Sequence, residues 1–323
     1  MMNNECIQKF GKILREKQIF LLTSHVDPDG DGIGGILSLY HAFKNLGKDV
    51  RMILSGPVGE RYLFLPGADK IDTGIPENLP TNKNTVLMTV DAPNIPRLGF
   101  DNESIELLDP YIVNLDHHTS NENFGDLVLM DEKSSASCEM IFYLLEGLNV
   151  NWTPEMATAC YAGILTDTGR FRFSNTRPET FTAASKLLAQ GAAHEQIVRV
   201  LFEEKSYGRL QLEALVLNTM KKEGPLAWMH CTKSMIEETN CEDTENLVNR
   251  LTEISDVEVA VFLREVSDKL TKVSFRAVNS IDVNQIASKF GGGGHAKASG
   301  AKLPHDLGTS TAKVIEACNR ALL

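Results

Sequence analysis

Short runs of strand-forming residues alternate with helical patterns through the first part of the chain, and this alternation most restricts its fold. The predicted strands cover residues 19–25, 50–54, 85–90 and 111–115, and a helical pattern at 33–46 separates the first two. Strands that alternate with helices form parallel sheets covered by helices on both faces. We therefore predict an α/β fold, with a parallel sheet and helices on both faces in the N-terminal part.

The remainder of the chain predicts two further parts. From Ser134 onward the pattern is helical, with Ser134 as the expected N-cap of a helix that ends at Gly147 and Thr153 as the cap of the next helix. Gly224-Pro225 interrupts this pattern, and β-rich runs with a closing helix follow in an α+β arrangement. The expected parts are a first domain over 1–193, a helical linker over 194–223 and a smaller α+β domain over 224–323.

Charge, cysteines and hydropathy exclude several classes of protein. The chain has 32 Lys and Arg against 43 Asp and Glu, a net charge of −11, and such a surface repels long nucleic acid. The 6 cysteines form no C-x-x-C pair, so neither a disulfide framework nor a zinc ribbon is expected. The N-terminus has no signal-peptide core, and the longest apolar stretch, 156–166, is shorter than the roughly 20 residues of a membrane-spanning helix. We expect a soluble cytoplasmic protein.

The densest group of reactive side chains follows the first predicted strand and contains His25, Asp29 and Asp31. The glycines here match a dinucleotide-binding fingerprint, but Asp31 lies in the loop that would receive a pyrophosphate. The aspartate spacing matches half of a calcium loop, but Ser38 stands where that loop needs a bidentate glutamate. A plain polar turn remains an open alternative, since Asp, Gly and Pro are common turn residues.

Other predicted strands end in the same kind of residue. Asp116, His117 and His118 directly follow the strand at 111–115, and Asp91 follows the strand at 85–90. Asp167 stands at the end of a predicted helix. Adjacent histidines behind an aspartate are poorly explained by packing, because their buried polar atoms would need partners. We therefore expect these side chains to converge.

Carboxylates gathered at one place repel one another, and a bound cation relieves this repulsion. Aspartate oxygens with imidazole nitrogens and no thiolate favour Mn²⁺, with Mg²⁺, Fe²⁺ or Co²⁺ as weaker candidates. The number of carboxylates suggests two ions. A pair of ions suits in-line displacement at a phosphate ester.

Four motifs in this order resemble those of the DHH phosphoesterases, a family named for the motif that stands here as Asp116-His117-His118. The segments that carry the resemblance are His25-x-x-x-Asp29-x-Asp31, Asp91, Asp116-His117-His118 and Asp167. It implies two sets of metal ligands, namely His25, Asp29 and Asp91 for one ion, and Asp31, Asp91, His117 and Asp167 for the other. Asp91 would then bridge the ions; His118 would contact the phosphate or protonate the leaving oxygen, and Asp116 would orient a histidine. Asp29 and Asp31 are expected in a glycine-rich turn, each facing a different ion.

The C-terminal part resembles the DHH-associated domain found in the branch of nanoRNases and pAp phosphatases. The matching segments are Ser274-Phe-Arg276, Asp282-Val283 and Phe290-Gly-Gly-Gly-Gly-His295-x-x-Ala298-x-Gly300. The resemblance implies a group that binds the part of the substrate away from the metals, namely Gly291, Gly292, Gly293, Gly294, His295 and Arg276, with Ser274 and Arg264 as weaker members. Ala277 departs from the serine that this branch often carries.

The resemblance implies a metal-dependent hydrolase that cuts short oligoribonucleotides to mononucleotides and pAp to AMP and phosphate. A cyclic di-AMP or pApA phosphodiesterase is the nearest alternative, because the same motifs serve both activities. A pyrophosphate or polyphosphate hydrolase and a nucleotide-binding regulator without turnover rank lower. The preferred substrate, the cleavage polarity, the metal used in the cell and the formation of a homodimer stay open.

Overall fold

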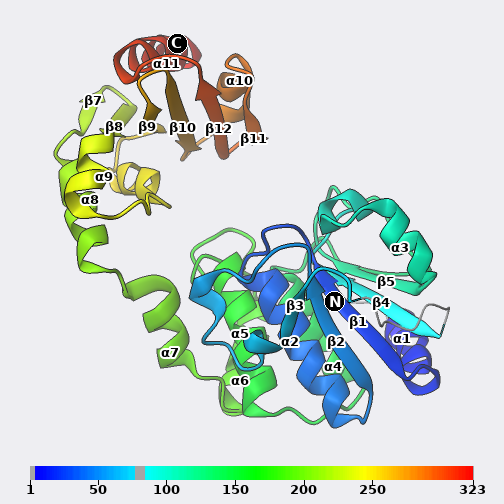
Figure 1. Ribbon diagram of the computed structural model, residues 1–323. Helices are drawn as coiled ribbons and strands as arrows, with labels where there is room; N and C mark the ends of the chain where they lie inside the picture. The colour runs from blue at the N-terminus through cyan, green and yellow to red at the C-terminus, as the bar shows by residue number, and fades with distance from the viewer. Residues whose placement is uncertain (1–3, 77–83, 323) are drawn as a thin grey trace. The chain divides into compact units, whose positions relative to one another are not determined.

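The computed structural model describes residues 4–76 and 84–322, and the chain divides into two compact units, Met1–Glu204 and Lys205–Leu323 (Figure 1). The division falls inside the segment predicted as a linker, 194–223. Each unit contains a β-sheet and hydrophobic clusters of its own. Within the described residues, no helix is both long enough and apolar enough to cross a membrane.

The first unit is built on a six-stranded parallel sheet in the order β3-β2-β1-β4-β5-β6. Its strands are β1 Ile19–Ser24, β2 Asp49–Leu54, β3 Ile71–Thr73, β4 Thr85–Val90, β5 Tyr111–Asp116 and β6 Leu127–Met130. The chain runs outward from β1 to β3 and returns to β4 beside β1, so the strand order reverses between β1 and β4. Open parallel sheets bind ligands at the carboxyl ends of the strands at such a point. The predicted α/β class is confirmed.

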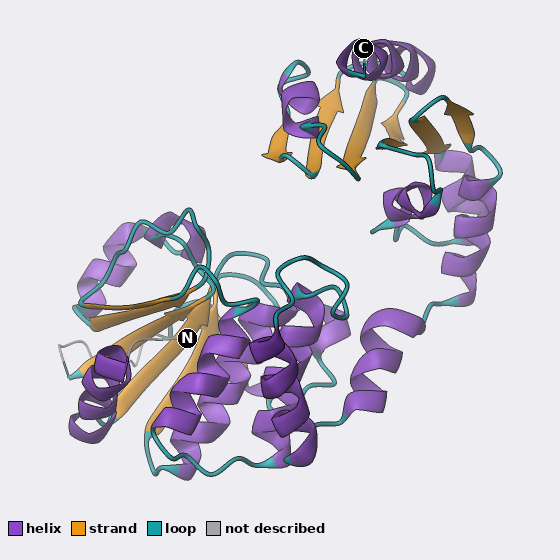
Figure 2. Cartoon of the chain, turned by 180° about the vertical axis from the view of Figure 1, so that it is seen from behind, coloured by secondary structure: helices purple, strands orange, loops and turns teal. Residues whose placement is uncertain are grey.

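Helices cover both faces of this sheet, and most of these helices pack against the same face (Figure 2). The larger group comprises α1 Asn4–Glu16, α2 Gly30–Asn45, α4 Ser137–Gly147, α5 Pro154–Asp167, α6 Pro178–Ala189 and α7 His194–Val198, followed by the π-helical turn η4 Arg199–Glu203. The opposite face packs against α3 Asn102–Leu108 and the 3-10 turn η3 Ile95–Leu98. Two further 3-10 turns are η1 Glu60–Tyr62 and η2 Ala68–Lys70.

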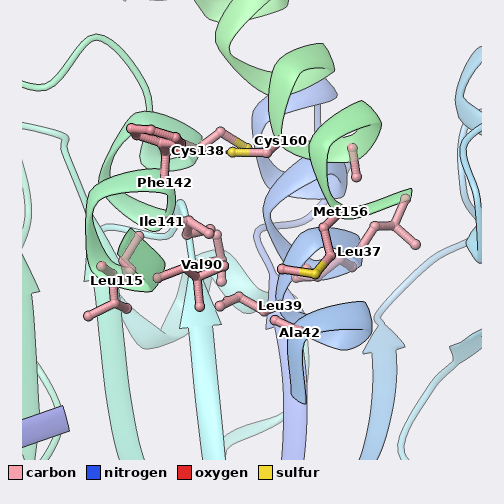
Figure 3. Close-up of a cluster of buried hydrophobic side chains, with 14 of the residues drawn as sticks. Leu37, Leu39, Ala42, Val90, Leu115, Cys138, Ile141, Phe142, Met156 and Cys160 are labelled. Atoms are coloured by element: carbon pink, nitrogen blue, oxygen red, sulfur yellow. Dashed lines mark hydrogen bonds between the residues drawn. The ribbon is translucent and has the colours of Figure 1, made fainter. Parts of the chain in front are cut away.

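Helices α2 and α5 are packed closely enough to require glycine. A Cβ atom on Gly34 would lie 2.4 Å from the carbonyl oxygen of Ala159, and one on Gly30 would lie 2.5 Å from Oγ1 of Thr166. Apolar side chains from α2, α4 and α5 fill the space between these helices and the sheet (Figure 3). The start of α2 is therefore held against the end of α5, which brings the two candidate ligands on these helices, Asp31 and Asp167, toward each other.

Two helix starts differ from expectation. Helix α2 begins at Gly30 because the Asp29 carboxylate caps it, accepting hydrogen bonds from the backbone of Asp31 at 2.9 Å and Gly32 at 3.3 Å. Asp31 thus lies in the first helical turn, where a free glycine-rich turn was predicted. Ser134 does not cap α4, whose N-cap is Ala136.

The start of α5 agrees with expectation. Thr153 caps this helix, and its side chain accepts a hydrogen bond from the backbone of Met156. Pro154 occupies the first helical turn, where a missing N–H costs no hydrogen bond.

The second unit contains a six-stranded mixed sheet in the order β11-β12-β10-β9-β8-β7. Its strands are β7 Lys221–Glu223, β8 Leu226–Cys231, β9 Val259–Ser267, β10 Leu270–Ala277, β11 Gly293–His295 and β12 Ala298–Leu303. Helices α10 Val283–Ser288 and α11 Leu307–Ala321 pack on one face; α8 Tyr207–Leu217, α9 Lys233–Thr239 and the 3-10 helix η5 Leu247–Glu253 belong to a cluster on the other. The glycine run contributes an edge strand, which its composition did not predict.

Candidate metal centre

Three neighbouring strands, β1, β4 and β5, deliver the predicted ligands to one edge of the first sheet. His25 follows β1, Asp91 follows β4, and His117 follows β5. Asp91 adopts a left-handed backbone conformation with φ of 60°, and its N–H donates to the carbonyl oxygen of Leu115 at 2.9 Å. Such backbone conformations are costly for a residue with a side chain and are concentrated at functional sites.

The first group of donors surrounds one oxygen of Asp91. Nε2 of His25 lies 3.6 Å from Oδ2 of Asp91. Asp29 offers a third atom, and all three donor atoms lie within 4.8 Å of one another. These separations are those expected of side chains that can share one cation.

The second group faces the other oxygen of Asp91. Nε2 of His117 lies 3.6 Å from Oδ1 of Asp91, 3.5 Å from Oδ2 of Asp167 and 4.0 Å from Oδ2 of Asp31. The two oxygens of Asp91 therefore point to different donor groups. This arrangement suits a carboxylate that bridges two ions.

Hydrogen bonds orient both histidines with Nε2 toward the carboxylates. Nδ1 of His25 lies 2.8 Å from the carbonyl oxygen of Val26, and Nδ1 of His117 lies 3.1 Å from that of Ser134. A carbonyl oxygen only accepts, so Nδ1 of His117 carries the proton in this arrangement. For His25 the contact with Val26 at 2.8 Å is shorter than the one at 3.3 Å from Nη2 of Arg97, and it favours the same tautomer. Nε2 then keeps its lone pair for a metal, the usual arrangement for a ligating histidine.

The electrostatics of the site favour added positive charge. Burial, followed by the charge of Asp91, raises the pKa of Asp31 well above its ordinary value and that of Asp167 to about 8. Asp167 is also the last residue of α5, at the negative end of the helix dipole. Burial opposes ionisation of Asp91 as well, but the adjacent His25, followed by His117 and His118, lowers its pKa.

The donor set fits divalent ions. Within residues 4–76 and 84–322, no lysine or arginine forms an ion pair with any of the four carboxylates of the two groups. Buried carboxylates without a cationic partner are stabilised by metal binding. The donors are oxygen and imidazole nitrogen only, which suits Mn²⁺ and similar ions better than thiolate-seeking ones.

His118 differs from the other two histidines. Its Nδ1 lies 2.7 Å from Oδ1 of Asp116, a fully buried carboxylate that also accepts from the backbone of His117 at 2.9 Å and from Nδ2 of Asn121 at 2.6 Å. This hydrogen bond raises the pKa of His118 to about 9. Nδ1 also lies 3.6 Å from Oδ1 of Asp91, but its bond to Asp116 occupies it. The ring, 42% exposed, is thus oriented and protonated near neutral pH.

Replacing Asp116 with asparagine is expected to bring the pKa of His118 down from about 9 toward 6.5. Because the pKa is raised in the fold, the pair stabilises the protein fully below pH 6.5, and this contribution is lost as the pH rises through about 9. Asp116→Asn should therefore lower stability more at pH 6 than at pH 10. An NMR titration of the His118 ring in metal-free protein measures the shift, with His230 of the second unit as internal control. An unchanged His118 titration would contradict the assignment.

The predicted substrate residues of the second unit share one face of its sheet. Arg276 pairs with Ala298 on β12, and Ala298 pairs with His295 on β11, so these three form one row. Ser274 belongs to the next row on the same face, because alternate residues of a strand point to the same side. The opposite face carries Phe275 and packs against α10 and α11.

A polar cavity of about 420 Å³ lies on this face and is lined in part by Arg264, Ser274 and Arg276. Arg276 donates from Nε to Oδ1 of Asn249 at 3.1 Å and is half-buried. Arg264 lies 3.7 Å from a carboxylate oxygen of Glu242, so part of its charge is already paired. His295 and the glycine run lie outside this lining.

At two positions of the glycine run, packing explains why the residue is glycine. A Cβ atom on Gly292 would lie 2.1 Å from the carbonyl oxygen of Gly300, and one on Gly294 would lie 2.6 Å from that of Ala298. Close approach of β11 to β12 therefore requires glycine at both positions. A Cβ atom on Gly293 would meet only one side-chain atom, at 3.8 Å, and Gly291 has nothing within 4 Å but a left-handed φ of 69°.

Sequence reasoning missed the groups that hold the candidate ligands in place. Backbone N–H groups of Ser137 and Cys138 donate to Asp31, and Nδ2 of Asn175 donates to the carbonyl oxygen of Asp167 at 3.1 Å. The two backbone donors carry no residue-type signature, so no motif could have identified them. The serine-rich run at 134–137 was the one visible signal.

Comparison with known proteins gives consistent matches along the chain. Residues 19–164 match the DHH family, N-terminal domain, and residues 231–322 match the DHHA1 domain. The chain is 36% identical over 314 residues to a bifunctional oligoribonuclease and PAP phosphatase NrnA of Thermus thermophilus, covering 95% of this chain and 91% of that protein. The protein of the same name in Bacillus subtilis is 29% identical, covering 88% of each chain. An exopolyphosphatase-related protein from Bacteroides fragilis has a similar structure, with a TM-score of 0.88, 26% identity and coverage of 99% and 97%.

Proposed function

Because the chain belongs to the DHH family of phosphate-ester hydrolases, we propose that it cuts short oligoribonucleotides to mononucleotides and converts pAp to AMP and phosphate. The observation that carries this proposal is Asp91, whose two oxygens face two separate groups of oxygen and imidazole donors. The relatives named for these two activities match this chain along most of its length and along most of their own length.

In this proposal His25, Asp29 and Asp91 hold one divalent ion, and Asp31, Asp91, His117 and Asp167 hold a second. Two such ions, most simply Mn²⁺, supply Lewis-acid polarisation of the phosphoryl group and acidify water near neutral pH. Asp91 belongs to both groups of donors and so fixes the position of one group relative to the other. His25 and His117 present Nε2 because their Nδ1 protons are held by backbone carbonyl oxygens.

His118 acts on the substrate in this mechanism. With Nδ1 bound to Asp116, its other ring nitrogen is free to contact the phosphate or to give a proton to the leaving oxygen. Asp116 is a positioning residue that fixes the ring and favours its protonated form. Burial of Asp116 and its bonds to His117 and Asn121 restrict this orientation further.

The second unit binds the part of the substrate away from the reacting phosphate. Support comes from the register that aligns Ser274, Arg276 and His295 on one sheet face, and from the cavity beside the first two. Arg276 and His295 are the main proposed contacts, whereas Arg264 is partly paired with Glu242. Gly291 and Gly293 are the glycines most open to a ligand.

Replacing Arg276 with alanine is expected to raise KM roughly 10- to 100-fold, the value of a hydrogen bond to a charged group, with a much smaller effect on kcat. The reason is that Arg276 would contact the substrate away from the reacting phosphorus. Steady-state kinetics with pAp and a diribonucleotide measure both parameters. Lys313→Ala, which removes an exposed charge on α11, is the matched control. Equal losses in kcat and kcat/KM would instead indicate that Arg276 stabilises the transition state.

Small nucleotides suit the charge of the protein better than long nucleic acid. A net charge of −11 disfavours extended polyanions, while one histidine, one arginine and a metal centre suffice for a short ligand. All 6 cysteines are free, which agrees with the reducing cytoplasm in which we propose that the enzyme acts.

The test is product release by purified, Mn²⁺-loaded protein from pAp, di- to penta-ribonucleotides, cyclic di-AMP, pApA and pyrophosphate. We expect mononucleotides from short RNA and AMP from pAp. Preferential turnover of cyclic di-AMP would replace the proposal with a second-messenger phosphodiesterase. Turnover of pyrophosphate alone, or of nothing, would refute a nucleotide hydrolase.

A further inference from the structure

The segment of residues 134–138, which follows β6 and includes the first two residues of α4, contacts three of the proposed metal ligands. The backbone N–H of Ser137 donates to Oδ2 of Asp31 at 2.6 Å, and that of Cys138 donates to Oδ1 of Asp31 at 2.9 Å. The Ser137 hydroxyl lies 3.1 Å from Oδ1 of Asp91, and the carbonyl oxygen of Ser134 receives Nδ1–H of His117. The 134–138 segment therefore determines where these ligands stand.

A buried carboxylate anchors this segment to the rest of the unit. Glu139 is fully buried and accepts hydrogen bonds from the backbone of Ser135 at 3.2 Å and from its hydroxyl at 2.5 Å. The Thr180 hydroxyl donates to the same oxygen at 2.7 Å, and Nη2 of Arg177 donates to the other at 2.6 Å. Both of these donors lie at the start of α6, so Glu139 ties the segment to that helix.

A second connection reaches the fourth carboxylate through the same region. Nδ2 of Asn175 donates to the carbonyl oxygen of Ser135 at 2.9 Å and to that of Asp167 at 3.1 Å. Asn175 is two residues before Arg177, the partner of Glu139. The chain at 175–180 thus holds the 134–138 segment on one side and Asp167 on the other.

We propose that Glu139 is a positioning residue for the metal centre, which it serves by fixing the 134–138 segment against α6 through Arg177 and Thr180. The inference rests on the proposed function, since it assumes that the ligands hold metal ions. None of the hydrogen bonds of Glu139 reaches a proposed ligand directly. Its effect must therefore pass through the 134–138 segment.

A buried ion pair alone is weak evidence of a functional role, because an apolar replacement is often as stable. The specificity of its partners distinguishes Glu139. Two of its four hydrogen bonds come from Ser135, inside the segment that contacts Asp31, Asp91 and His117. Residues that support metal ligands through hydrogen bonds typically change metal affinity 10- to 100-fold when altered.

The test is Glu139→Gln, which keeps the size of the side chain and removes its charge. We expect Mn²⁺ affinity, measured by calorimetry on metal-depleted protein, to fall roughly 10- to 100-fold. Hydrogen exchange in the metal-free protein should be faster in the 134–138 segment. If Glu139→Gln does not fold, Ser135→Ala is the alternative, because it removes one hydrogen-bond donor to Glu139 and leaves the ion pair between Glu139 and Arg177. Ser135→Ala should lower Mn²⁺ affinity and speed hydrogen exchange in the 134–138 segment, each by less than Glu139→Gln.

The matched control is Glu213→Gln in the second unit, another buried carboxylate, paired with Lys205, Arg209 and Arg250. It should lower thermal stability without changing Mn²⁺ affinity. Equal Mn²⁺ affinity in Glu139→Gln and unaltered protein, or an equal loss in Glu213→Gln, would overturn the positioning role. Absence of Mn²⁺ binding to unaltered protein would instead overturn the proposed metal centre, and the exchange rates of the 134–138 segment would still report on the anchoring by Glu139.

Discussion

Asp91→Ala is expected to reduce hydrolysis of pAp and short oligoribonucleotides by about 10³-fold or more. Asp91 supplies one oxygen to each donor group, at 3.6 Å from His25 and 3.6 Å from His117, so its removal would affect both proposed metal sites at once. Electrostatic stabilisation by bound metal is worth several kcal/mol, and each 1.36 kcal/mol is tenfold in rate. Asp91→Asn should lose nearly as much, because an amide cannot bridge two cations. Single-turnover kinetics at saturating Mn²⁺ measure the loss.

Stability distinguishes this outcome from misfolding. In metal-free protein the charge of Asp91 raises the pKa values of Asp31 and Asp167, so removing that charge relieves repulsion within the site. We therefore expect Asp91→Asn to unfold at a temperature close to that of unaltered protein when no metal is present. Asp72→Asn, which removes an exposed charge on β3, is the control for net charge and should keep full activity. Activity within tenfold of normal in Asp91→Ala would refute a bridging role.

Removal of divalent ions by a chelator is expected to abolish activity and to lower the unfolding temperature of the first unit. Ions that bind only the folded state stabilise it by mass action, about 2.7 kcal/mol at a concentration 100 times their Kd. Mn²⁺ added back should restore both properties. Calorimetry with and without Mn²⁺ measures the unfolding temperature, and product assays measure the activity. Full activity after exhaustive chelation would contradict a metal-dependent mechanism.

Metal binding should also release protons. Near pH 7 Asp167, with a pKa of about 8, holds a proton in the absence of metal, and burial with the charge of Asp91 raises the pKa of Asp31 as well. An ion binds the deprotonated carboxylates, so affinity should increase as the pH rises through about 8. Titration in two buffers of different ionisation enthalpy counts the protons. A heat that does not depend on the buffer would contradict the raised pKa values.

Much of the first unit follows from local sequence patterns. The strands β1, β2, β4 and β5 were predictable because each is a six-residue segment rich in strand-forming residues beside a helical pattern or a turn. The two remaining strands have only 3 and 4 residues, too few to show a periodicity. The candidate ligands His25, Asp91 and His117 were predictable for a related reason, since each directly follows a strand that ends at one edge of the sheet.

Features that depend on contacts between distant residues were not predictable. Ser134 has the residue type of a helix cap, but its carbonyl oxygen is used by His117, and α4 starts three residues later. Asp29 has the residue type of a turn and is used as a cap. Glu139 reaches Thr180 across 41 positions, and the N–H of Ser137 reaches Asp31 across 106. No local pattern encodes such pairs.

The second unit shows the same division between local and distant information. Its strands β8, β9 and β10 were visible as β-rich or alternating runs, but the pairing that aligns Arg276 with His295 depends on the register of β10, β12 and β11. The glycine run was expected, from the resemblance, to bind the part of the substrate away from the metals. The close contact of Gly292 with Gly300 gives part of it a packing role that composition could not reveal.

The most direct test of the central claim is anomalous diffraction from crystals soaked in Mn²⁺, which counts and locates the ions without reference to activity. A bridging Asp91 predicts two manganese peaks roughly 3.5 to 4 Å apart, one beside His25 and Asp29 and one beside His117 and Asp167. A single peak, or two peaks that do not share Asp91, would contradict the two-metal centre.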